Sequence, residues 1–408
     1  MKSIFLFSAV LLTAVSFGEQ IEIHARQTEK IPECSRLFSR YEDPESGVVS
    51  YLLKPKSYAF NQQSIYFTCK SMTDNGRFLL FHASNEENDG HGKRLVVLDL
   101  DSEIFHDLGK GIGLPFLDTE HDILYHVAAD KTRFCRRDLL KDPKNEITVC
   151  QLPSELCPSD GDVDSLLTHL TLTKNHDKAF FDSRIRGRFI HGLVDLKTGK
   201  YEKWGETPFF ANHGQLNPAN DKMAMLAWEC CWTGEAGDRY KKFGAVYPRM
   251  WIVEPGNRFR LIPSIRNYAT HEKWSEDGKG IYFCSKGGVY FHEIDTDRQY
   301  CVSPIHAVHA TMTANNRYVT FDSELEPNYR GCSWRIGFTN RETGRSIWIH
   351  SKRPALNPRE RPSTMHPDPH PTFIRRDRYI VCTINNADGH MDLSITPVAQ
   401  LIEKTAAK

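Results

Sequence analysis

The chain has 408 residues, and its 52 lysines and arginines are balanced by 52 aspartates and glutamates. A formal net charge of zero leaves no basic footprint for nucleic acid or for an anionic membrane surface, so we expect neither as a partner. The length suits one large domain or two ordinary ones. Aromatic residues make up 11% of the chain, and helical periodicity is scarce, which together favour an all-β protein.

The N-terminus has the pattern of a secretory signal peptide. Lys2 is followed by a short apolar run over residues 4–15, and the small residues Ser16 and Gly18 precede the expected cleavage point. We therefore expect residues 1–18 to be removed and the protein to be secreted or periplasmic. No later run is long and apolar enough to cross a bilayer, so no membrane span is predicted.

A hairpin frame recurs along the chain. Its clearest copy covers residues 270–284, where two apolar runs flank a turn containing Asp277-Gly278, a strong hairpin signal. This hairpin should place His271 roughly opposite Cys284. Four further copies also have a histidine twelve residues before a return-strand residue, at His169, His213, His309 and His370, and two weaker copies start at Cys69 and Gly113.

Seven strand-only copies, spaced by roughly 40 to 60 residues, predict a seven-bladed β-propeller formed by residues 19–408 as a single domain. The expected blades cover residues 66–100, 113–152, 166–204, 213–263, 270–304, 309–350 and 369–397. The innermost strand of each blade lines the central channel, so the recurring histidines should converge on the axis. A long insertion, residues 230–248, is expected to face a substrate.

The first candidate site is a metal centre formed by His271, His366 and His370, with Cys284 as a candidate fourth ligand. His366 and His370 are four residues apart in a proline-stiffened segment, and His271 comes from another blade. Three histidines, or three histidines and a cysteine, suit Zn²⁺, whereas histidines with oxygen ligands suit Mn²⁺. The alternative is that these histidines are separate polar groups of the channel wall.

The second candidate is an acid–base pocket. His82, His126, His169 and His213 belong to neighbouring blades and are expected to face one end of the channel. Imidazole is the usual group for proton transfer near neutral pH. For any one of the four, the alternative is a hydrogen-bonded structural histidine.

The third candidate is an anion clamp of arginines. Arg184, Arg186 and Arg188 alternate after one predicted strand, and Arg249 precedes another. A guanidinium holds a carboxylate through two hydrogen bonds, but an alternating run sends at most one or two of its members to one face. Two tyrosines of the long insertion, Tyr240 and Tyr247, are candidate proton donors beside Arg249.

Five motifs in the second half of the chain resemble the oligogalacturonate lyase family. In order, they are His213-Gly-Gln-Leu-Asn-Pro218, Arg249-Met-Trp-Ile-Val253, Thr270-His-Glu-Lys-Trp274, His309-Ala-Thr-Met-Thr-Ala-Asn315 and His370-Pro-Thr-Phe373. The resemblance implies a seven-bladed propeller with a Mn²⁺ centre that cleaves uronate-containing oligosaccharides by β-elimination. It also implies that the metal histidines correspond to His271, His366 and His370.

This chain departs from that family at two points. The family's glutamine ligand has no counterpart in residues 361–365, and its Cys-His-Glu-Gly-Pro segment is matched by Ala227-Trp-Glu-Cys230, which has no histidine. The chain is also similar to the ulvan lyases, exported seven-bladed propellers that act on uronate polysaccharides. That second resemblance implies His, Tyr and Arg catalytic groups and a largely structural metal.

We therefore hypothesise a secreted polysaccharide lyase that cleaves a uronic-acid-containing polysaccharide or oligosaccharide, ulvan-like or galacturonan-like, by β-elimination. In this hypothesis, Arg184 and Arg249, with His213, neutralise the uronate carboxylate. His126 is the base or acid, with His82 or Tyr240 as its partner. Arg186, His169 and Tyr247 complete the substrate site, and a divalent Zn or Mn ion is structural or Lewis-acidic. The alternative is a non-catalytic, metal-containing propeller that binds glycan or protein.

Overall fold

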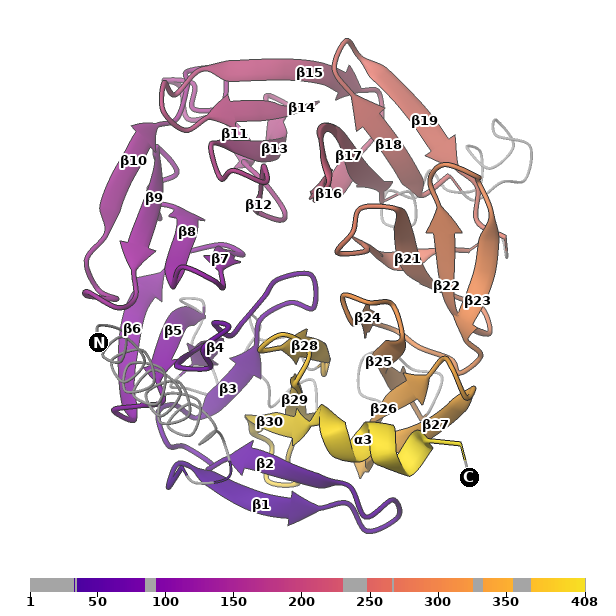
Figure 1. Ribbon diagram of the computed structural model, residues 1–408. Helices are drawn as coiled ribbons and strands as arrows, with labels where there is room; N and C mark the ends of the chain where they lie inside the picture. Colours follow the sequence, from indigo (N-terminus) through magenta and orange to yellow (C-terminus); the bar gives the residue numbers. More distant parts are fainter. Residues whose placement is uncertain are drawn as a thin grey trace, which may run out of the picture.

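The structure is a computed structural model that describes residues 33, 35–84, 93–229, 248–265, 268–325, 333–354 and 368–407. These residues form seven antiparallel sheets arranged in a ring around a central axis (Figure 1). The predicted all-β, seven-bladed β-propeller is therefore confirmed. The expected signal peptide lies outside the described residues and stays a prediction.

The strands follow the chain blade by blade around the ring. The first sheet contains β3 (Asn61–Ser64), β4 (Phe78–Ser84), β5 (Arg94–Asp99) and β6 (Ile104–Lys110). The second contains β7 (Phe116–Asp118), β8 (Ile123–Val127), β9 (Arg133–Asp138) and β10 (Ile147–Gln151). The third contains β11 (Val163–Ser165), β12 (Thr171–Leu172), β13 (Lys178–Ile185), β14 (Arg188–Asp195) and β15 (Tyr201–Thr207). The fourth contains β16 (Ala211–Asn217), β17 (Asn220–Trp228), β18 (Met250–Glu254) and β19 (Arg258–Ile262).

The remaining three sheets complete the ring. The fifth contains β20 (Thr270–Trp274), β21 (Gly280–Ser285), β22 (Gly288–Glu293) and β23 (Gln299–Ser303). The sixth contains β24 (Ala310–Met312), β25 (Tyr318–Glu324), β26 (Trp334–Asn340) and β27 (Arg345–Arg353). The seventh contains β28 (Thr372–Ile374), β29 (Tyr379–Asn385) and β30 (Met391–Pro397), to which β2 (Val49–Leu53) and β1 (Phe38–Glu42) are added.

The seventh sheet closes the ring with strands from both ends of the described chain. β2 pairs with β30, with Tyr51 opposite Ile395. Helix α3 (Val398–Thr405) follows β30 and packs against β26 and β27. The recurring hairpin frame does not predict this pairing, because a contact between segments so far apart in the chain has no local signal.

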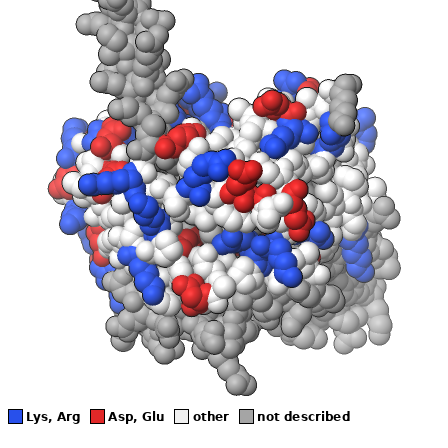
Figure 2. Space-filling view, turned by 90° about the horizontal axis from the view of Figure 1, so that it is seen from below, with Lys and Arg blue, Asp and Glu red and all other residues white. Residues whose placement is uncertain are grey.

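Apolar side chains fill the space between neighbouring blades. One cluster joins Met225 of β17 and Trp251 of β18 to Ile281 and Phe283 of β21. Equivalent clusters hold the other blades together and give the functional side chains a rigid support. On the face seen in Figure 2, acidic and basic side chains interleave, as the zero net charge suggests. Among the described residues, no helix has the length and hydropathy needed to cross a membrane.

Three histidines at or just before the innermost strands have a positive backbone φ. In the β20–β21 hairpin, Thr270 pairs with Cys284, and the register shifts before Lys273. His271 lies in this irregularity with a φ of 53°; His213 in a similar shift has 52°, and His370 has 48°. Positive φ is uncommon for residues other than glycine and costs about 1 kcal/mol or more. Such a bulge re-aims the side chains of His271 and His213, and His370 has a similar φ two residues before β28 begins.

Candidate functional site

The segment between β3 and β4 enters the centre of the ring. The Tyr66 ring lies 5.3 Å from that of His169, 6.2 Å from His213, 6.0 Å from His309 and 4.8 Å from His370, measured between centroids. The next residue, Phe67, lies 5.2 Å from His309 and 6.0 Å from His271. All five recurring histidines, each at or just before the innermost strand of its blade, therefore converge on the axis around two aromatic rings.

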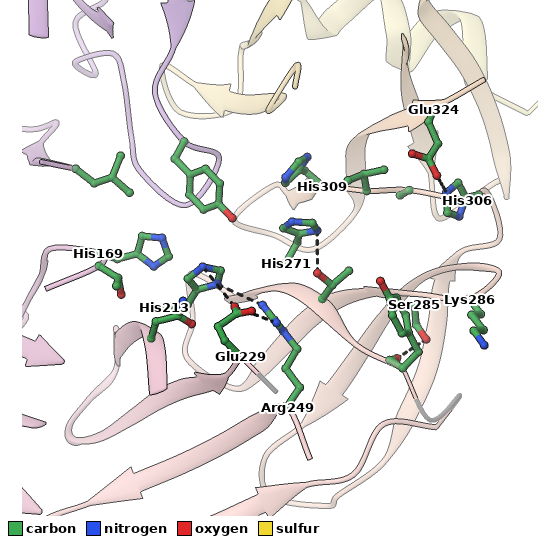
Figure 3. A pocket seen from close by; sticks show the side chains of 18 of the residues that line it. His169, His213, Glu229, Arg249, His271, Ser285, Lys286, His306, His309 and Glu324 are labelled. Atoms are coloured by element: carbon green, nitrogen blue, oxygen red, sulfur yellow. Dashed lines mark hydrogen bonds and ion pairs between the residues drawn. The ribbon is translucent and has the colours of Figure 1, made fainter. Parts of the chain in front are cut away.

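A pocket of about 1190 Å³ opens beside this cluster. In Figure 3, His169, His213, Glu229 and Arg249 lie together on one side of it, His271 and His309 lie next to them, and Lys286, His306 and Glu324 lie farther along. The volume exceeds that of most small-molecule sites, so the pocket has room for several sugar units.

Arg249 is held by two buried glutamates. Its Nη1 lies 3.0 Å from Glu229 Oε1, and its Nε lies 2.9 Å from Glu272 Oε2. Glu272 also contacts Nδ1 of His213, at 3.3 Å. Although burial favours the protonated acid, Arg249 and His213 hold the pKa of the Glu272 carboxyl well below its ordinary value. Because both carboxylates share the Arg249 charge, the arginine is rigidly placed but already largely neutralised.

Three side chains next to this cluster could hold a metal ion. His309, Asp368 and His370 offer ligand atoms that all lie within 4.8 Å of one another, and all three residues are buried. Nδ1 of His309 lies 3.0 Å from Asp322 Oδ2, which orients the ring, and its Nε2 has no hydrogen-bond partner among the described residues. The His271 ring lies 4.0 Å from that of His309. A nitrogen–oxygen donor set with a carboxylate behind one histidine fits Mn²⁺ or Zn²⁺.

The metal site expected from the sequence is only partly the observed one. His370 belongs to it and His271 adjoins it, whereas His366 lies outside the described residues. Cys284 does not belong to it, because this residue lies on the second strand, β21, and packs in an apolar cluster with Val289 and Phe321. Burial raises the pKa of the Cys284 thiol well above its ordinary value.

Sequence reasoning missed His309 and Asp368 as ligands. His309 stands in the recurring frame, and a usable signal was Asp322, thirteen residues later on the return strand, which accepts its Nδ1–H. Asp368 lies between two prolines two residues before His370, so its carboxylate could have been expected near that ring. A segment in which His, Asp and Pro alternate is therefore the sequence pattern that indicates these ligands.

The expectation that His82 and His126 face the channel is wrong. Both lie on second strands, β4 and β8, and neither lines the pocket. His126 accepts a hydrogen bond from Arg137 Nε, at 3.1 Å, and burial lowers the pKa of both histidines. Of the four histidines in the expected acid–base pocket, the structure brings His169 and His213 together, with ring centroids 5.1 Å apart.

The expected arginine clamp is likewise divided. Arg184 forms an ion pair with Asp164 at 3.0 Å and lies 6.0 Å over the ring of Phe210, a pocket-lining residue, so it reaches only the rim. Arg186 is exposed and pairs with Asp160. Arg249 alone among the predicted arginines lines the pocket. Tyr240 and Tyr247 lie outside the described residues.

No protein-family model matches the chain, and no curated protein matches it. Two solved structures are similar over 88% of this chain and 96% of their own. One is an oligogalacturonate lyase in complex with manganese, at 20% identity and a TM-score of 0.68. The other is the oligogalacturonate lyase from Vibrio parahaemolyticus, at 19% identity and a TM-score of 0.69. At this identity the likeness concerns the fold: the chain has the seven-bladed propeller fold of the oligogalacturonate lyases.

Proposed function

We propose that the protein is an exported polysaccharide lyase that cleaves a uronic-acid-containing glycan, of galacturonan type, by β-elimination. The observation that carries this proposal is the large pocket lined by Arg249, His213 and His309. Glu272 contacts His213, and Asp368 and His370 lie within ligand distance of His309. The oligogalacturonate lyases that share the fold favour a galacturonan over ulvan.

The difficult step of such a reaction is the removal of the C5 proton next to a carboxylate. The developing enolate-like charge requires positive groups placed beforehand. A divalent cation held by His309, Asp368 and His370 would supply most of that charge to the uronate carboxylate. Arg249, fixed by its two glutamates, orients the same carboxylate rather than neutralising it alone.

His213 is the best-placed base. Its Nδ1 faces Glu272, which holds the ring in one tautomer, and its Nε2 is left for the substrate, 3.9 Å from the nearest carboxylate oxygen of Glu229. A carboxylate behind an imidazole is the usual arrangement for a proton acceptor. His213 thus takes the role that the sequence analysis gave to His126.

Tyr66 is the best-placed acid. It lines the pocket, and no described residue hydrogen-bonds its hydroxyl. Burial, followed by the charge of Glu272, raises the pKa of Tyr66 well above its ordinary value, so the phenol keeps its proton. As the C5 proton moves to His213, the C4–O4 bond breaks, O4 takes the Tyr66 proton and a C4–C5 double bond forms. Proton transfer from His213 back to Tyr66 through solvent restores the enzyme.

The direct test is the ultraviolet absorbance of unsaturated uronate ends. The purified protein would be incubated with polygalacturonate, oligogalacturonates, ulvan, alginate and glycosaminoglycans, with and without a chelator. We expect the absorbance to rise with a galacturonan and chelation to suppress it. Binding of a glycan without any rise in absorbance would instead identify a non-catalytic binding propeller.

A further inference from the structure

The β3–β4 segment separates the large pocket from a second, smaller cavity. Tyr66 lines the large pocket, whereas Thr68, Cys69 and Lys70, which follow it closely, line the second cavity of about 140 Å³. His169 borders both. His213 and Tyr66, the groups assigned above to proton transfer, do not line the smaller cavity.

The smaller cavity contains a buried lysine without a carboxylate partner. Lys273 of β20 is 8% exposed, and its Nζ lies 3.4 Å from the carbonyl oxygen of Phe67. Within the described parts of the chain it forms no ion pair. The neighbouring Lys70 differs, since its Nζ lies 2.8 Å from Glu276 Oε1. An ammonium removed from water with a single long carbonyl contact is an unfavourable arrangement.

Among the described residues, the carboxylates near Lys273 do not form an ion pair with its ammonium. Glu276 and Asp377 act on it through their charges, which oppose the effect of burial and of Lys70 on its pKa. Glu276 is taken by Lys70. Burial raises the pKa of the Cys69 thiol to about 11, so this side chain is neutral. Burial and the nearby Lys70 lower the pKa of Lys273 to about 8, which still leaves its amine mostly protonated at neutral pH. An anion that enters the cavity would therefore meet an ammonium that has no ion pair within the described residues.

The rest of the cavity wall is mainly apolar. Phe116, Leu117, Leu170, Leu216 and Trp274 contribute to it. Inorganic anions such as sulfate have no apolar part to pack against these side chains and are costly to desolvate. A cavity of about 150 Å³ holds a molecule the size of benzene, which has six non-hydrogen atoms. The observed volume matches that size.

We propose that this cavity binds a small monocarboxylate of about six non-hydrogen atoms. Its carboxylate pairs with Lys273, and its carbon chain packs against Leu170, Leu216 and Trp274. The site lies on the far side of the β3–β4 segment from the large pocket, and the proposal does not depend on lyase activity. The ligand class is that of butyrate and of other short organic acids.

Calorimetric titration of the whole protein at constant ionic strength tests the proposal, with butyrate as the probe and with sulfate and 1-butanol as comparisons. We expect one butyrate per chain, with sulfate and butanol at least tenfold weaker. Sulfate binding as tight as butyrate would show that charge alone is recognised, and equally tight butanol would show that Lys273 is not used. Either result, or no butyrate binding, overturns the proposal.

Three substitutions sharpen the test. Lys273→Met should weaken butyrate binding at least tenfold, whereas Lys279→Met, at an exposed lysine in the turn of the same hairpin, should leave it unchanged. Leu170→Ala should enlarge the cavity and shift the preference from butyrate to hexanoate. If Lys273→Met does not fold, the preference of Leu170→Ala decides the matter, because unchanged selectivity in that variant would place the ligand elsewhere.

Discussion

Histidines on the innermost strands and histidines on the second strands of this propeller have different surroundings. His213 and His309 lie at innermost strands, reach the axis and meet carboxylates and other rings. His82 and His126 lie one strand farther out and are enclosed within the blades. The two groups stand in similar sequence contexts, so the strand that carries a histidine decides whether it can meet a substrate.

The largest contrast is expected from a matched pair of substitutions. His213→Ala should lower kcat by about 10³-fold, as the loss of a general base typically does, while His126→Ala should change it less than threefold. Initial rates of absorbance increase on the best glycan give both values. Equal losses in the two variants would mean that the inner-strand position has no special role.

The next largest effect is expected from the removal of a candidate metal ligand. His309→Ala should lower activity by about 10²-fold or more and lower the metal content of the purified protein, because a site with two of three ligands binds weakly. Elemental analysis supplies the readout independent of activity. Wild-type metal content in this variant would remove His309 from the site, and His350→Ala, at a buried histidine of β27, is the matched control.

Tyr66→Phe should lower activity on a glycan by about 10²-fold. If the hydroxyl protonates the leaving oxygen, the loss should nearly vanish with a 4-deoxy-4-fluoro uronate, because fluoride departs without a full proton transfer. The ratio of the two rates, wild type against variant, is the measurement. A similar loss on both substrates would assign Tyr66 to packing among the histidines rather than to proton donation.

The second-strand histidines should affect stability instead. His126→Ala removes the acceptor of a buried hydrogen bond from Arg137 and should lower the free energy of unfolding by about 2 kcal/mol. Urea unfolding of the wild type and the variant gives the difference. A change below about 0.5 kcal/mol would show that Glu146, 2.9 Å from Arg137 Nη2, is a sufficient partner.

The stability of the folded protein should also depend on pH. Burial lowers the pKa of His82 well below its ordinary value, so the unfolded chain takes up a proton below about pH 6.5 that the folded chain does not. Stability should therefore fall as the pH decreases below that value, by up to about 1.4 kcal/mol per pH unit for this residue. In His82→Leu, the free energy of unfolding should fall less steeply between pH 6.5 and 5 than it does in the wild type. Parallel curves of unfolding free energy against pH for the two proteins would contradict a lowered pKa of His82.

Much of the ring could be predicted because each blade repeats a local hairpin signal. The turn at Asp277-Gly278 fixes β20 and β21 to within about one residue, and the expected bounds of the second to sixth blades lie within a few residues of the observed sheets. The first blade was expected at residues 66–100, which leaves out both β3 and β6. The pairing of β2 with β30 and the entry of Tyr66 and Phe67 into the centre could not be predicted, since both depend on contacts between distant segments.

The candidate site was predicted only where the hairpin register determined it. His169, His213, His271 and His370 converge as the frame required. His82, His126 and Cys284 were misplaced because side chains on a second strand alternate towards the two neighbouring blades and not towards the axis. The glutamates around Arg249 carried no recognisable spacing, as they come from β20 and from the end of β17.

The seventh sheet has a consequence for the order of events during synthesis. Val49 and Gln400, which are hydrogen-bonded in the finished protein, are 351 residues apart. At about 5 to 20 residues per second, roughly 20 to 70 seconds pass between the making of β2 and that of β30. Through that interval β2 presents an unpaired edge, the kind of surface on which chains aggregate. A ribosome that stalls before β30 would therefore leave an open arc, which quality-control proteases could distinguish from a closed ring.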